Sequence, residues 1–148
     1  MKKIIITLLA ATMTLLCSCA ASPEANILVV RENGGHHKPF TDAAMAWLDS
    51  VSTSRNFTVT VISDMNDVNT DFLKDFNAII QLDFPPYTWP EAAQSAFREY
   101  IEKGLGGYVG FHHATLLGDF DGYPIWEWFS NFMGGIRFAG YIEPLADG

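Results

Sequence analysis

The chain has 148 residues, of which 49% are hydrophobic and 14% aromatic, enough for one domain with a core of its own. This composition excludes a disordered or fibrous chain. With 9 basic residues against 17 acidic ones, a formal net charge of −8 and no basic run, the chain is not expected to bind nucleic acid.

The first 18 residues have the pattern of an export signal. Two lysines are followed by an apolar run from residue 4 to 16, which is short for a membrane span, and then by small residues. The sequence LCSC at 16–19 resembles the lipobox of bacterial lipoproteins, in which the signal is cut before a cysteine that then carries lipid. We therefore predict a lipoprotein signal over residues 1–18, lipid attachment at Cys19, a tether over 19–25 and a location in the bacterial cell envelope. An ordinary cleaved signal is the alternative.

Removing the signal changes the composition of the folded part. Both cysteines lie in the signal or at the anchor, so disulfides, thiolate nucleophiles and cysteine zinc sites are excluded for the domain. Loss of Lys2 and Lys3 leaves seven basic residues against 17 acidic ones, a formal net charge of −10. The expected partner is therefore neutral or cationic, or a small molecule held by local groups.

Strands and helices are predicted to alternate along the rest of the chain. Apolar runs rich in β-branched residues predict strands near residues 26–31, 58–62, 77–81 and 106–111, and the alternating second run is expected at a sheet edge. Helices are predicted from Thr41 or Asp42 to about Ser52, from a capping box at Thr88–Glu91 to Gly104, and over 124–133. A short helix or turn is predicted over 69–76. This alternation predicts an α/β fold with three layers, a parallel sheet with helices on both faces.

Polar side chains follow three of the predicted strands. His36 and His37 follow the first strand, Asp83 the third, and His112 and His113 the fourth. In parallel sheets, ligands bind beyond the carboxyl ends of the strands, near the point where strand order reverses. If the strand order is 2-1-3-4, two inter-strand steps separate the histidine pairs by roughly 10 Å. The sequence therefore predicts one pocket that contains both pairs.

Three segments occur in a characteristic order: ILVVRENGGHHKPF, GLGGYVGFHHAT and WEWFSNFMGGIRF. They resemble the trehalose-utilisation (ThuA-like) family. The resemblance implies a flavodoxin-like fold, similar to that of class I glutamine amidotransferases, over residues 26–148, and a role in sugar utilisation. In amidotransferases the strand that corresponds to GGYVGF ends in a tight elbow that presents a nucleophilic cysteine. Here the matching position holds His112.

The chain departs from the family pattern in its length. Family members continue beyond the double glycine Gly134-Gly135 with further strands and another His-containing segment, whereas this sequence ends at Gly148. The resemblance therefore implies a domain that is incomplete at its C-terminus. We expect an exposed apolar patch beside the last strand, and self-association of the chain, for example as a homodimer, through that patch.

The histidines admit a catalytic and a structural interpretation. Imidazole titrates near neutral pH and can act as a general acid or base. We predict His112 and His113 as the catalytic pair, supported from the first loop by His36 or His37. Because neighbours on an extended segment point to opposite sides, one histidine of each pair is expected to face the pocket. In the structural interpretation His113 packs under the following helix, and the first pair is a solvated loop.

A metal site is a further hypothesis. His36 or His37, Asp83, and His112 or His113 offer nitrogen and oxygen ligands for zinc or a similar ion. No close spacing such as His-x-x-x-His places two ligands on one element, so no metal is assigned and the cofactor stays unknown. Asp83 has an alternative structural role, capping its own loop.

Aromatic residues are abundant after the third and fourth predicted strands. Aromatic faces stack on sugar rings, and carboxylates accept hydrogen bonds from hydroxyl groups. Trp89 and Tyr123, both expected on loops, are the predicted ligand-binding aromatics, whereas Trp126 and Phe129 have the spacing of core residues on a helix. The candidate carboxylates are Asp119, Asp121 and Glu127.

The sequence thus predicts an exported domain that binds or acts on a small carbohydrate in a histidine-lined crevice. Two alternatives stay open: a noncatalytic glycan-binding or docking module, and an inactive fragment of a longer protein. The sugar, the reaction and the question of enzymatic activity stay open as well.

Overall fold

A four-stranded parallel sheet forms the centre of the structure. The computed structural model describes residues 23–32, 35–116 and 122–134. The strands are β1 (Ala25–Arg31), β2 (Phe57–Ile62), β3 (Ala78–Leu82) and β4 (Gly107–Phe111). Their order is β2-β1-β3-β4, and every pairing is parallel, with Ile27 opposite both Val59 and Ala78. The predicted parallel direction of the strands is therefore confirmed, and their order is the one on which the expected meeting of the two histidine pairs depends.

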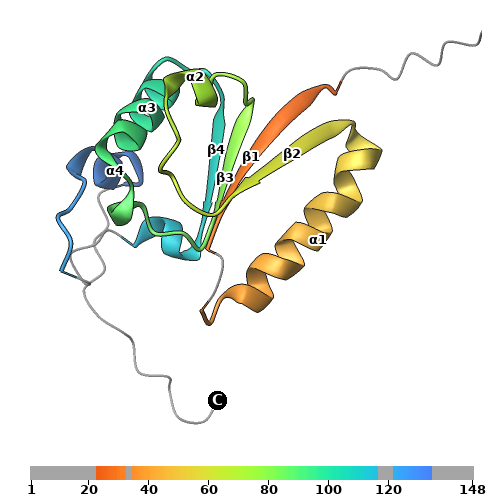
Figure 1. Cartoon of the computed structure of the whole chain (residues 1–148), viewed down its shortest axis with the longest axis horizontal. Helices are drawn as coiled ribbons and strands as arrows, with labels where there is room; N and C mark the ends of the chain where they lie inside the picture. Colours follow the sequence, from red (N-terminus) through yellow and green to blue (C-terminus); the bar gives the residue numbers. More distant parts are fainter. Residues whose placement is uncertain (1–22, 33–34, 117–121, 135–148) are drawn as a thin grey trace, which may run out of the picture.

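Helices cover both faces of this sheet, as Figure 1 shows. Helix α1 (Lys38–Arg55) lies on one face, and α2 (Thr70–Leu73), α3 (Glu91–Glu102) and α4 (Glu127–Phe132) lie on the other. Two short 3-10 helices, η1 (Pro86–Thr88) and η2 (His112–Thr115), follow β3 and β4. The predicted α/β fold with three layers is confirmed. Among the described helices, none is both long and apolar enough to cross a membrane.

The larger part of the core lies between the sheet and α3. Leu28 and Val30 of β1 face this layer, while Val29, between them, packs with Leu48 of α1 on the opposite face. This division follows from the alternation of side chains along a strand. In α3 the buried residues recur at helical spacing, so one side of the helix is apolar and faces the sheet. They are Ala93, Ala96, Phe97 and Tyr100.

Helix α1 begins earlier than the capping residues predict. It starts at Lys38, with Pro39 in its first turn and His37 at the N-cap position. The fixed φ of proline suits the first turn of a helix, which explains the earlier start. Thr41 is buried inside the helix, and its hydroxyl donates to the carbonyl of Lys38 at 3.1 Å.

The capping box predicted over Thr88–Glu91 is wrong. Thr88 belongs to η1, and α3 starts at Glu91 with Pro90 at the N-cap position and no side-chain cap. Helix α4 is also shorter than predicted, because it begins at Glu127 and not at residue 124. Proline has φ values suited to both a helix start and an extended segment, and this ambiguity explains both boundaries.

Strand β4 presents apolar side chains on the face that carries α1. Val109 and Phe111 pair in register with Ile80 and Leu82, which point to that face. The side chains of Val109 and Phe111 are exposed. The ring of Phe111 lies 6.2 Å from that of Phe40, another exposed aromatic residue. The expected apolar patch beside β4 is therefore present among the described residues. The self-association expected from it stays a prediction.

Candidate functional site

Side chains from three loops meet at the carboxyl edge of the sheet. His37 follows β1, Asp83 follows β3, and His112 and His113 follow β4. The ring centroid of His37 lies 4.8 Å from that of His112 and 4.2 Å from that of His113. The two histidine segments therefore share one location, as the strand order predicts. They are closer than the roughly 10 Å spacing of two strand steps because their side chains extend into the gap between the backbones.

A buried aspartate orients His112. Oδ1 of Asp83 lies 2.6 Å from Nδ1 of His112; the Asp83 side chain is 1% exposed and that of His112 is 58% exposed. An ionised carboxylate can only accept a hydrogen bond, so Nδ1 donates and the lone pair of Nε2 is left available. The same arrangement serves a histidine that transfers protons and a histidine that binds a metal.

Asp83 and His112 both have left-handed backbone angles. Their φ values are +49° and +46°, and this conformation costs a residue other than glycine on the order of 1 kcal/mol or more. Gly110 allows the close turn between β4 and η2, because a Cβ there would lie 2.6 Å from the Tyr108 hydroxyl oxygen and 3.0 Å from Cβ of Ala114. The tight elbow expected at His112 is therefore present. Backbone strain of this kind is concentrated at functional sites.

His113 also belongs to the cluster. Its ring stacks on that of His112 with centroids 4.2 Å apart and an interplanar angle of 17°. The expectation that only one residue of this pair faces the pocket is wrong, because residues 112–115 form η2 and the alternation of an extended strand does not apply. Burial first, and then the charges of His112 and His37, lower the pKa of His113 below its usual value.

In the first pair, only His37 joins the cluster. His36 is exposed and lies outside it. Nδ1 of His37 lies 3.7 Å from Oε2 of Glu32, so the carboxylate attracts that side of the ring. The alternative between His36 and His37 is therefore resolved in favour of His37 as the residue near His112.

Trp89 is a core residue, which corrects its prediction as a ligand-binding aromatic. It is 3% exposed, and its ring packs 5.4 Å from that of Phe97 and 6.3 Å from that of Phe129. It does follow η1 outside a helix, as predicted, but its side chain turns under α3 into the core. A position on a loop does not determine the direction of the side chain.

Tyr123 is exposed and offers an aromatic surface. Its ring stacks on that of Tyr87 with centroids 4.6 Å apart and an interplanar angle of 20°. Glu127 is exposed in the first turn of α4. Asp119, Asp121 and the predicted lipid-attachment residue Cys19 lie outside the described residues.

Gln81 supports the site, although the sequence analysis did not select it. It is fully buried in β3; its side chain accepts a hydrogen bond from the Tyr108 hydroxyl at 2.8 Å and donates one to the carbonyl of Phe84. These bonds join β4 to the loop that contains Asp83. The sequence did contain a signal for this role, namely a glutamine inside an otherwise apolar strand. A buried amide needs hydrogen-bond partners, so such a residue is expected to bond to neighbouring groups.

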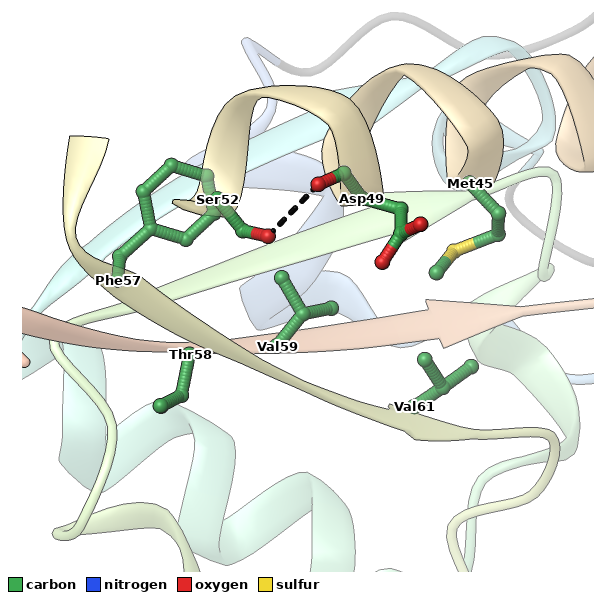
Figure 2. Close-up of a pocket in the computed structure, with 7 residues that line it drawn as sticks. All are labelled: Met45, Asp49, Ser52, Phe57, Thr58, Val59 and Val61. Carbon is green, nitrogen blue, oxygen red and sulfur yellow. Dashed lines mark hydrogen bonds between the residues drawn. The ribbon is translucent and has the colours of Figure 1, made fainter. Parts of the chain in front are cut away.

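A hollow elsewhere on the molecule does not resemble a reactive site. Figure 2 shows it between α1 and β2, with a volume of about 410 Å³. Asp49 is the one ionisable residue in its lining, and the Ser52 hydroxyl already donates to the carbonyl of Asp49 at 2.9 Å. The histidine cluster is therefore the stronger candidate site.

Comparison with known proteins identifies a family whose model covers the three quoted segments, and solved structures with a similar fold. The model of the ThuA family, described as trehalose utilisation, matches residues 26–146. The chain belongs to the ThuA family. A ThuA-like protein of known structure from Bacteroides uniformis ATCC 8492 is 29% identical to it, with a TM-score of 0.70 over 82% of this chain and 48% of that one. A ThuA-like protein from Parabacteroides merdae ATCC 43184 is 21% identical, with a TM-score of 0.45 over 61% of this chain and 32% of that one.

Comparison with curated protein sequences gives no match. This ThuA chain spans about half the length of the Bacteroides uniformis relative, 48% of that chain. Family membership places it in a group whose described role is trehalose utilisation, and the histidine cluster lies inside the matched residues.

Proposed function

We propose that this ThuA chain acts on a carbohydrate in sugar utilisation, with His112 as the acid or base. The observation that carries the proposal is the 2.6 Å contact between His112 and the buried Asp83 at a strained elbow. A histidine held in one orientation by a carboxylate, with its other nitrogen available, is suited to proton transfer. His112 is exposed enough for a substrate to approach it.

The neighbouring histidines suit a polyhydroxylated ligand. His37 and His113 lie against His112, and neutral imidazoles both donate and accept hydrogen bonds, as sugar hydroxyls do. General acid–base catalysis contributes about 100-fold to 10,000-fold in rate, which sets the loss expected when the acid or base is removed.

A noncatalytic glycan-binding module is the second candidate, and the stacked pair of Tyr87 and Tyr123 favours it. An exposed aromatic face buries the apolar face of a sugar ring without any need for proton transfer. The two candidates differ in the residues on which they depend. Catalysis depends on His112, whereas simple binding depends more on Tyr123.

The proposal is tested with three alanine variants and a panel of trehalose and related disaccharides. We expect His112→Ala to reduce turnover by at least about 100-fold and also to lower the melting temperature, because its removal leaves the buried Asp83 carboxylate without a partner. Turnover is therefore compared at a temperature at which all the variants are folded. His113→Ala is also expected to lower the melting temperature, because His113 is partly buried. His36→Ala is the matched control, expected to change neither quantity. Turnover is measured by chromatography of the products and binding by calorimetry.

Three outcomes are decisive. Failure of the unmodified protein to bind or convert any sugar in the panel contradicts the proposal. Binding without turnover, insensitive to His112→Ala but weakened by Tyr123→Ala, favours the glycan-binding module. Equal loss of melting temperature in the two histidine variants, without any effect on sugars, means that the histidines are packing residues.

The lipid anchor is part of the same proposal, because an exported protein would meet its sugar in the cell envelope. It rests on the sequence LCSC at 16–19. We expect Cys19→Ala to move the protein from the membrane to a soluble fraction, since one modified residue carries the attachment. Cys17→Ala is the matched control and should stay on the membrane. Fractionation of bacterial cells measures both, and Cys19→Ala protein that stays on the membrane contradicts the anchor.

A further inference from the structure

We propose that His37, Asp83, His112 and His113 bind one divalent transition-metal ion, with zinc as the best match. Each of the four residues offers one ligand atom, and these atoms lie within 4.8 Å of one another. In a tetrahedral zinc site with bonds of about 2.0–2.1 Å, neighbouring ligand atoms are about 3.3 Å apart. Side-chain rotations that bring the atoms closer by an ångström or so would therefore complete the site.

The position of Asp83 is an independent indication of a cation. Among the described residues, its Oδ2 atom has no hydrogen-bond partner although it is buried, and Oδ1 contacts His112. Burial of a carboxylate oxygen without a partner is costly, and such groups are rare in folded proteins. A divalent ion bound directly by Asp83 would stabilise this carboxylate.

The orientation of the His37 ring leaves one nitrogen atom available for the ion. Nδ1 of His37 faces Glu32 at 3.7 Å, so Nε2 of that ring is the candidate ligand atom. For Asp83 and His112 to bind the same ion directly, their present contact must give way to bonds with the metal. A carboxylate beside the nitrogen that does not bind metal is the usual outer partner of a metal-binding histidine, because it holds the ring in place and raises its basicity.

The set of donors favours particular metals. Three imidazoles and one carboxylate suit zinc and its neighbours in the first transition row, whereas magnesium and calcium prefer oxygen ligands. With neutral imidazoles the four side chains carry one negative charge, which a divalent cation more than compensates. The expected ion is therefore Zn²⁺, with Co²⁺ as a spectroscopic substitute.

This inference goes beyond the proposed function, because metal binding requires no sugar. With an ion bound, His112 would serve as a ligand and not as a free acid or base. A negative result with sugars therefore leaves the metal proposal standing, and a negative result with metals leaves the sugar proposal standing.

Binding is tested with the full chain in detergent, with Cys17 and Cys19 replaced by Ser so that no thiolate competes for the ion. After treatment with a chelator, we expect Zn²⁺ to bind with one ion per chain and to raise the melting temperature. Mg²⁺ and Ca²⁺ at the same concentration should have no effect. We expect His37→Ala and His112→Ala each to weaken Zn²⁺ binding by at least about 100-fold, and Asp83→Asn by about 10-fold to 100-fold. His36→Ala is the matched control and should change the affinity by less than about twofold.

A second measurement uses the chain without any histidine substitution, so its result does not depend on whether the histidine variants fold. Diethyl pyrocarbonate modifies accessible imidazoles, and mass spectrometry assigns each modified residue. We expect Zn²⁺ to protect His37, His112 and His113 while His36 stays reactive. Absence of Zn²⁺ binding, equal protection of His36, or an equal loss of affinity in His36→Ala and His37→Ala overturns the proposal.

Discussion

Replacement of Gly106 by Ala is expected to remove about 2–5 kcal/mol from the free energy of unfolding, a large part of the stability of a small domain. A Cβ at this position would lie 1.7 Å from the Tyr100 hydroxyl oxygen and 2.5 Å from the carbonyl oxygen of Asn77. The backbone oxygen cannot rotate away. Tyr100 is fully buried and its hydroxyl donates to the carbonyl of Phe76 at 3.0 Å, so its displacement breaks this bond inside the core.

Gly107 provides the matched control one residue away. A Cβ at Gly107 would have Cβ of Ala78 as its nearest neighbour, at 3.9 Å, which is ordinary van der Waals contact. Gly107→Ala should therefore change the free energy of unfolding by less than about 1 kcal/mol. Urea denaturation of both variants measures the difference. Similar losses in the two variants would show that the close approach of α3 to the start of β4 does not limit stability.

Phe97→Ala is expected to lower the free energy of unfolding by about 3–5 kcal/mol, because it opens a cavity at the centre of the main core. Phe97 is fully buried, and its ring lies 5.4 Å from that of Trp89, 5.2 Å from that of Tyr108 and 5.9 Å from that of Phe129. These rings come from the η1–α3 junction, β4 and α4, so the truncation loosens several elements at once.

Trp47→Ala serves as the control for Phe97→Ala. Trp47 is an aromatic residue of comparable size on α1, but its side chain is exposed. Its removal should change the free energy of unfolding by about 0.5 kcal/mol or less. Chemical denaturation of the two variants under the same conditions makes the comparison. If Trp47→Ala lowered the free energy of unfolding as much as Phe97→Ala, the face of α1 that carries Trp47 would have to be buried in solution. That result would contradict the core described above.

The core and the histidine cluster are connected through Tyr108. Its ring packs on Phe97, and its hydroxyl donates to Gln81, whose amide donates to the carbonyl of Phe84 next to Asp83. Burial raises the pKa of the Tyr108 hydroxyl, which therefore remains protonated and keeps donating at neutral pH. The strained backbone at Asp83 is thus supported by the fully buried Gln81, which is hydrogen-bonded to the partly buried Tyr108. Rigid support of this kind is what a strained functional residue requires.

The sequence alone predicted the parallel sheet and, on the condition of a 2-1-3-4 strand order, the meeting of the two histidine segments. Strands buried on both faces, such as β1 and β3, read as continuous apolar runs, and their alternation with helices implies a parallel sheet. Once the strands are parallel, the residues that follow them must lie on one edge. The family was also recognisable from the three quoted segments, all of which lie within the residues 26–146 that the family model matches.

Only the tertiary structure decided which side chains form the site. It selected His37 over His36, brought His113 into the cluster through the turn of η2, placed Trp89 in the core and buried Asp83 against His112. None of these outcomes has a local signal, because the direction of a loop side chain depends on φ, on its rotamer and on neighbours far away in the sequence. Periodicity reports which face of an element is apolar, and that information ends where the strand or helix ends.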